Sequence, residues 1–195
     1  MIIFKFDGHK ASAPKHLWTL PDELYFATSR EVIDDVLDEA KDRFDSSIED
    51  IRGIKDKAYM LLSIFIGILG VVIAIYTDHE LLSSINNRRL FKAIFFFDLV
   101  VVAYSIIQLT LIINPAYMMV KGQDPKENTK GFDAMLGIDT TEQVDSYRKD
   151  SLQMMQYKIE FNESVITEMN SRLENVITTA SFVFVVTLLV MLFKF

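Results

Sequence analysis

Three polar side chains within a largely apolar stretch are the residues whose types and spacing could best support chemistry. Asp98, Ser105 and Gln108 lie in this stretch. At 100° per residue they fall within about an 80° arc, so they share one face of a helix. A carboxylate that faces lipid is costly, and this face should therefore turn toward protein or water. Two interpretations stay open, a pore-lining stripe in an oligomer or interhelical hydrogen bonding, unless the span begins late enough for Asp98 to reach the interface.

No catalytic residues, metal site or cofactor-binding motif are expected from the remaining residues. The chain has no cysteine, which excludes thiol nucleophiles and Cys-ligated zinc. Its histidines are His9, His16 and His79, and the last is expected across a membrane from the other two. The seven glycines form neither a G-x-G-x-x-G motif nor a phosphate-binding loop. With 20 Lys and Arg against 27 Asp and Glu, nucleic acid is not an expected partner.

Three apolar segments are long enough to cross a bilayer, which is the partner that the composition most directly indicates. Residues 58–77 carry no charge, and 20 helical residues reach about 30 Å. Residues 175–193 form a second segment that ends at Lys194. The middle segment is placed at 91–113, where Asn114-Pro115 should end or kink the helix.

Two charged segments are expected to be amphipathic helices that continue into the first and last spans. Residues 30–57 and 139–174 each repeat apolar side chains at steps of three and four, typical of a coiled-coil seam. Thr28-Ser-Arg-Glu31 and Asp139-Thr-Thr-Glu142 have the spacing of capping boxes that begin such helices. Ser47 and Asn162 occupy inward seam positions, where a polar residue can fix the register. The predicted fold is an all-α integral membrane protein with two coiled-coil-like cytoplasmic stalks.

The remaining segments connect these helices and set the orientation. Residues 1–29 are expected to form an N-terminal arm, 78–90 an external hairpin and 114–138 a cytoplasmic loop. Nine Lys and Arg residues near the spans lie on the side of the large polar segments, against four on the other side. This excess favours a cytoplasmic N-terminus and 114–174 segment with an external C-terminus, although Arg88 and Arg89 favour the opposite.

Small side chains form one face of the first span. Ser63, Gly67, Gly70 and Ala74 lie together at helical spacing. Such residues allow two helix backbones to approach closely, so we expect this face to pack against another helix.

One stretch resembles a known group of proteins. Glu39 to Ala74 reads as an acidic amphipathic helix that ends in Lys55-Asp-Lys57-Ala58 and passes directly into a glycine-containing span. It is similar to the small transmembrane effectors of bacterial anti-phage defence systems, such as the SLATT-like proteins and the effectors linked to cyclic-nucleotide signalling or retrons. The resemblance implies a bacterial inner-membrane protein that oligomerises and depolarises the membrane when triggered. The third span and the second stalk depart from the two-span members, so no residue role is transferred.

Two functions are expected from these features, neither of them enzymatic. The first is an oligomeric effector that permeabilises the membrane when it is triggered through its cytoplasmic helices. The alternative is a membrane scaffold or sensor subunit that binds and regulates a soluble cytoplasmic partner. A homo-oligomer is expected under both, because three helices enclose no conduit alone and parallel heptad seams favour association.

Overall fold

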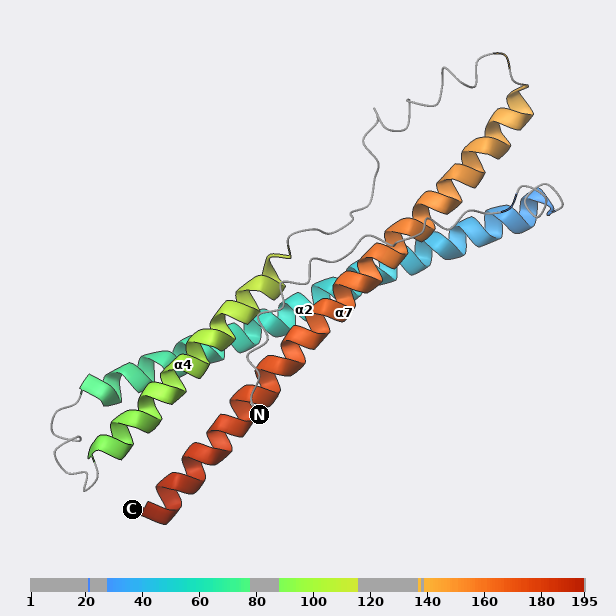
Figure 1. Ribbon diagram of the computed structural model, residues 1–195. Helices are drawn as coiled ribbons and strands as arrows, with labels where there is room; N and C mark the ends of the chain where they lie inside the picture. Colours follow the sequence, from blue (N-terminus) through green and yellow to red (C-terminus); the bar gives the residue numbers. More distant parts are fainter. Residues whose placement is uncertain (1–20, 22–27, 78–87, 116–136, 138, 195) are drawn as a thin grey trace. The chain divides into compact units, whose positions relative to one another are not determined.

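The computed structural model contains three long helices, and it describes residue 21 and residues 28–77, 88–115, 137 and 139–194. The helices are α2 (Arg30–Thr77), α4 (Arg88–Ile113) and α7 (Thr140–Lys194) (Figure 1). The predictions for the N-terminal arm, most of the external hairpin, most of the cytoplasmic loop and all three histidines lie outside the described residues. The prediction of an all-helical chain is confirmed for the part that the structure describes.

Each helix contains a segment long and apolar enough to cross a membrane, as the sequence predicts. The segment in α4 is the most buried of the three, while those in α2 and α7 expose most of their side chains. Coiled-coil stalks and insertion into a bilayer stay predictions.

The helix ends follow the local sequence signals. The backbone N–H of Gln143 donates to the carbonyl oxygen of Asp139 at 2.9 Å, and α7 begins at the next residue. Before α2 this part is played by Ser29, whose carbonyl oxygen accepts from the N–H of Ile33 at 3.2 Å, so α2 begins one residue later than a capping box that starts at Thr28 would place it. At the other end of α4, the helix stops at Ile113 because Pro115 disfavours a helical conformation at the residue before it.

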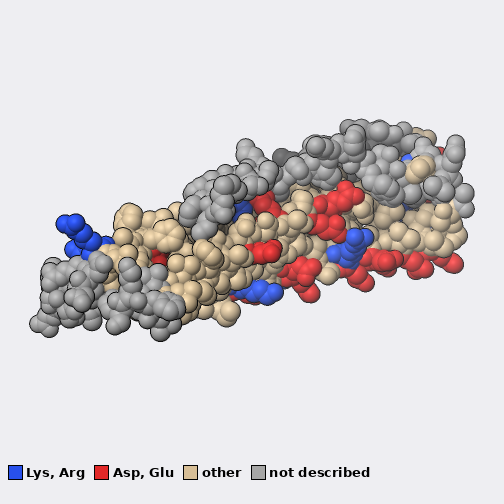
Figure 2. Space-filling model, turned by 60° about the horizontal axis from the view of Figure 1, so that its bottom comes forward, with Lys and Arg blue, Asp and Glu red and all other residues tan. Residues whose placement is uncertain are grey.

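The chain divides into two units, and α2 and α7 each contribute to both. We call the described residues 30–52 and 140–166 the charged unit, and residues 53–77, 88–115 and 167–194 the apolar unit. Asp and Glu side chains cover much of the visible face of the charged unit (Figure 2). In the apolar unit, α4 runs beside the C-terminal parts of α2 and α7.

The core of the charged unit is a small cluster between its two parallel helices. Phe44 and Ile48 of α2 pack on Ile159 of α7, and all three are buried. Lys158 lies beside this cluster, with its Nζ 6.0 Å from the centroid of the Phe44 ring. Partial burial in this place lowers the pKa of the Lys158 ammonium below its usual value.

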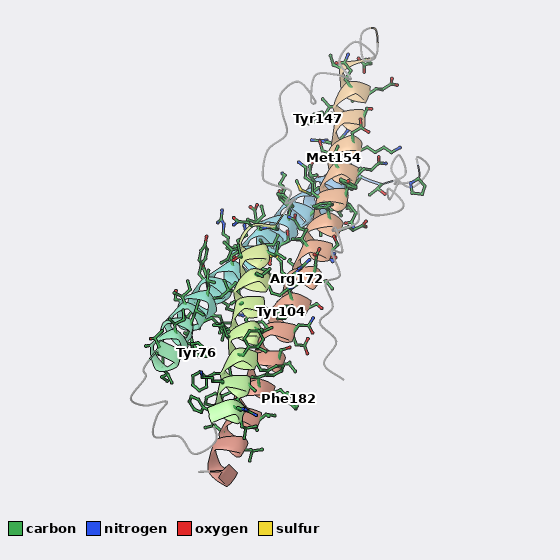
Figure 3. All side chains as sticks on the ribbon, turned by 60° about the vertical axis from the view of Figure 1, so that its left-hand side comes forward. Tyr76, Tyr104, Tyr147, Met154, Arg172 and Phe182 are labelled. Carbon is green, nitrogen blue, oxygen red and sulfur yellow. The ribbon has the colours of Figure 1, made fainter. Side chains whose placement is uncertain are left out.

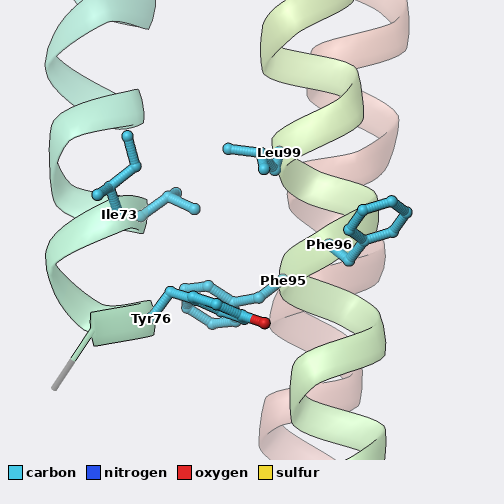
Figure 4. A pocket seen from close by; sticks show the side chains of 6 residues that line it. Ile73, Tyr76, Phe95, Phe96 and Leu99 are labelled. Carbon is cyan, nitrogen blue, oxygen red and sulfur yellow. The ribbon is translucent and has the colours of Figure 1, made fainter. Parts of the chain in front are cut away.

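In the apolar unit, α2 and α4 meet through aromatic and aliphatic side chains. The rings of Phe91 and Phe95 stack with centroids 4.5 Å apart and pack on Val72 and Ile75. Beside this contact, an open apolar hollow of about 190 Å³ lies between the two helices, with Tyr76 and Leu99 among its lining residues (Figure 4). Among the described residues, α2 and α4 therefore meet mainly through apolar side chains.

Phe44→Ala tests the core of the charged unit. Truncation of a buried phenylalanine lowers the free energy of unfolding by about 3 kcal/mol or more. A loss of this size makes opening of the charged unit about 100-fold more frequent. Hydrogen–deuterium exchange of peptides from 30–52 and 140–166, in the full-length protein, should accelerate accordingly. The matched control is Val36→Ala, because Val36 is exposed on the same helix. Equal exchange in the two variants would contradict this account of the core.

Candidate functional site

The polar face of α4 lies against α7. Ser105 and Gln108 are 0% and 4% exposed, and Asp98 is half-buried. The Thr187 hydroxyl of α7 donates to Oδ1 of Asp98 at 2.9 Å. The Ser105 hydroxyl donates to the carbonyl oxygen of Val101 on its own helix at 2.9 Å. The Asp98 bond joins two helices, whereas the Ser105 bond stays within α4. A pore-lining role and an interhelical role of this face both stay predictions.

Arg172 of α7 makes the most extensive polar contact of the apolar unit. Its Nη1 donates to Oε1 of Gln108 on α4 at 3.0 Å (Figure 3). Its Nε and Nη2 donate to Oε1 of Glu168 at 3.1 and 2.7 Å, one helical turn earlier on α7. The guanidinium therefore joins the two helices and has its charge balanced by a carboxylate in the same place.

Sequence reasoning missed three of these partners. In the sequence Arg172 is one of the nine positive charges near the spans, and no role is predicted for Glu168 or Thr187. The available signal was spacing along antiparallel helices, since Asp98 and Gln108 are 10 residues apart and their partners Thr187 and Arg172 are 15 apart. The two spacings differ by five residues, and the long Arg172 side chain can bridge that distance. The spacing alone therefore does not predict that Arg172 meets Gln108.

The small-residue face of α2 does not pack against α4 or α7 in the part of the chain that the structure describes. Ser63, Gly67, Gly70 and Ala74 are all exposed, and at Gly67 and Gly70 a Cβ would meet no atom within 4 Å. The expected close approach is therefore absent among the described residues, because α4 packs on the opposite side of α2 at Val72 and Ile75. A contact of this face with another chain stays a prediction.

The two polar seam residues of the charged unit meet each other. Nδ2 of Asn162 donates to Oγ of Ser47 at 3.1 Å, and both side chains are buried. The Ser47 hydroxyl in turn donates to the carbonyl oxygen of Phe44 at 2.7 Å. A buried amide makes this bond only when the two helices are correctly aligned, so the pair favours a single register.

Ion pairs on the rim of the charged unit repeat the same alignment. Arg30 pairs with Asp145 at 2.8 Å, Arg148 with Asp34 at 3.1 Å, and Arg43 with Glu163 at 2.9 Å. Because these side chains are partly exposed, each pair adds little stability. A shifted register would separate these three pairs.

In the described parts of the chain, no group of three His, Asp or Glu side chains is placed to hold a metal ion. The polar contacts that join the described helices are hydrogen bonds and ion pairs, and they can align these helices.

Comparisons with known proteins identify no relatives. No protein-family model matches the chain, and no curated protein or solved structure shows a significant match.

Ser47→Ala tests the buried polar pair. The variant removes the acceptor of a buried amide hydrogen bond and should lower the free energy of unfolding by about 1–3 kcal/mol. Adding Asn162→Leu should restore part of the loss, because an apolar pair needs no hydrogen bond there. Thermal unfolding of the detergent-solubilised protein, followed by circular dichroism, provides the comparison. A double variant less stable than Ser47→Ala would contradict the assignment.

A double-mutant cycle tests the contact between α4 and α7. Asp98→Leu and Thr187→Val each remove one partner of the hydrogen bond and should show a coupling of about 0.6 kcal/mol, the average for hydrogen bonds between membrane helices. Thr110→Val is the control, because the Thr110 hydroxyl donates to the carbonyl oxygen of Ile106 on its own helix. It should show no coupling to Asp98→Leu. Strictly additive effects of the first pair would argue against the bond.

Proposed function

We propose that this protein is an oligomeric membrane effector that permeabilises the membrane when its charged unit is triggered. The observation that carries the proposal is the continuity of two helices. α2 is 48 residues long and α7 is 55, and each passes from the charged unit into a segment apolar enough to cross a membrane. A rotation or shift of either helix in the charged unit would thus reach the apolar segment without an intervening loop.

The exposed surface of the apolar unit supports a role within a bilayer. Large apolar side chains are exposed on all three helices, including Ile64 on α2, Phe96 on α4 and Phe184 on α7. A water-soluble protein rarely exposes so much contiguous apolar surface. Lipid and further copies of the same chain are the partners that this surface suits.

The biological setting belongs to the proposal as well. The resemblance of Glu39 to Ala74 to anti-phage membrane effectors supports the bacterial inner membrane as the location and defence as the role. The distribution of Lys and Arg supports a cytoplasmic charged unit. In that orientation a cytoplasmic signal would act on the charged unit, and the membrane potential would be the quantity that changes.

The alternative, a scaffold or sensor subunit, has an observation of its own in its favour. Val32 and Val36 on α2 and Val144 and Tyr147 on α7 are exposed apolar side chains of the charged unit. The Arg30–Asp145 ion pair joins the two helices at the same level. Exposed apolar groups at one level of two paired helices could receive a soluble protein, and such a protein could equally be the trigger of an effector.

The test compares two substitutions at Gly53, where α2 leaves the charged unit. Gly53→Ala should be tolerated, because a Cβ there would meet no atom within 4 Å and alanine favours a helix. Gly53→Pro should interrupt the helix, at a cost of about 3 kcal/mol. A voltage-sensitive dye would follow the membrane potential of bacterial cells during titrated induction, with growth measured in parallel and insertion checked by membrane fractionation.

We expect wild type and Gly53→Ala to depolarise the membrane before growth stops, and Gly53→Pro to be inactive at equal membrane abundance. An inserted wild-type protein that leaves the potential unchanged at every induction level would contradict the effector. Binding of a soluble protein to the charged unit in those cells, lost on Val36→Asp, would then establish the scaffold.

A further inference from the structure

A row of polar side chains on α7 points away from the other helices of the apolar unit. Ser171, Glu174, Thr178 and Ser181 are all exposed. At 100° per residue they fall within about an 80° arc, so they form one face, which we call the outer stripe. It is separate from the polar face of α4, and no role was assigned to it from the sequence.

The opposite face of α7 makes the contacts within the chain. Val176 and Val183 are buried there, and Thr187 on that side donates its hydrogen bond to Asp98 of α4. On a helical projection these residues lie about 160–200° from the middle of the outer stripe. The outer stripe therefore cannot reach α4 by a small rotation of α7, because that rotation would break the existing packing.

Lipid is a poor neighbour for the outer stripe. If the span begins near Asn175, Thr178 and Ser181 lie about 4.5 and 9 Å further along the helix, inside the hydrocarbon region. Two hydroxyls on one face inside that region need water or polar partners, while the Glu174 carboxylate lies just before the span, at the entrance to this face. Neighbouring exposed residues outside the arc, such as Ile177 and Phe184, are apolar and suit lipid.

We propose that the outer stripe lines a water-filled vestibule formed between copies of this chain, and that the vestibule attracts cations. The proposal rests on the membrane-permeabilising function proposed above. A single chain has three helices, which cannot enclose water, so the facing wall has to be the same stripe of further copies. Each copy brings one carboxylate, Glu174, and the nearby Arg172 is turned inward to Glu168 and Gln108. A ring of Glu174 side chains therefore concentrates cations.

The same face of α7 becomes apolar beyond the outer stripe. Val185 lies within the arc and is 53% exposed, and Leu188 and Leu189 flank the arc on its two sides and are exposed as well. A ring of valine and leucine side chains around a narrow path expels water and blocks ions. The vestibule thus leads to an apolar gate at Val185, which keeps the path closed until the helices move apart.

Cysteine reactivity tests whether the outer stripe faces water, and the native chain has no cysteine to interfere. Ser181→Cys is compared with Phe184→Cys, where Phe184 is 65% exposed but lies outside the arc. In the full-length protein in membranes, a water-soluble thiol reagent should modify the Ser181→Cys variant about tenfold faster or more, because an apolar surrounding suppresses the reactive thiolate. Equal or reversed rates would overturn the vestibule whether or not the wild type depolarises cells.

Conductance tests the gate and the preference for cations. Val185→Thr should depolarise cells at lower induction than wild type, whereas Val71→Thr, the same change at an exposed position of α2, should not. In planar bilayers under a potassium chloride gradient, Glu174→Gln should move the reversal potential toward zero, and Glu174→Asp should keep the wild-type value.

The outcomes separate the two proposals. If wild type depolarises cells but Val185→Thr matches Val71→Thr and Glu174→Gln leaves the reversal potential unchanged, the pathway along the outer stripe is wrong and permeation takes another route. If the Ser181→Cys variant reacts rapidly but no variant conducts, the proposed function fails together with the pathway.

Discussion

The rest of the structure depends on one constraint. Two of its helices each have to be stable in two different surroundings. α2 and α7 keep their backbone hydrogen bonds along their whole length, while their side chains change from charged to apolar. Because neither helix is interrupted, one part of it cannot change direction independently of the other part. Each unit must therefore find its own packing within a geometry that the continuous helices impose.

The charged unit meets this constraint with a narrow seam and specific polar pairs. Phe44, Ile48 and Ile159 pack together in this seam, and Ile33, Ile51, Leu152, Phe161 and Val165 are buried apolar residues of the same unit. A short apolar seam between two helices could slip by one turn with little loss. The buried bond between Ser47 and Asn162, together with the ion pairs on the rim, makes a shifted register unfavourable.

The apolar unit uses its polar groups differently. α4 joins α2 through aromatic packing but joins α7 through hydrogen bonds of Asp98 and Gln108. In a surrounding without water, these hydrogen bonds fix the position of α4 along α7. The apolar contact between α4 and α2 would allow the two helices to slide past each other. The two contacts of α4 thus differ in how much movement they allow, and a movement of α2 past α4 would leave the contact with α7 intact.

The sequence was sufficient to predict the three apolar helices, because runs without charge depend only on residues close in the chain. Helical periodicity places Asp98, Ser105 and Gln108 on one face of α4. It could not identify Thr187 and Arg172 as the groups that meet this face. Likewise, the small residues at Gly67 and Gly70 suggested a packing surface, while the side of α2 that meets α4 carries Val72 and Ile75. Periodicity shows which residues share a face, but the neighbour of each face depends on how distant segments dock.

The pairing of Ser47 with Asn162 joins residues 115 positions apart in the chain. During synthesis at about 5–20 residues per second, the first half of the charged unit waits about 6–23 s for its second half. Through that interval Phe44 and Ile48 have no intramolecular partner from α7, although α2 and α4 are already made. The nascent chain therefore passes through a stage in which α2 and α4 are complete and α7 is not. The order of translation gives the α2–α4 contact time to form before either unit receives its segment of α7.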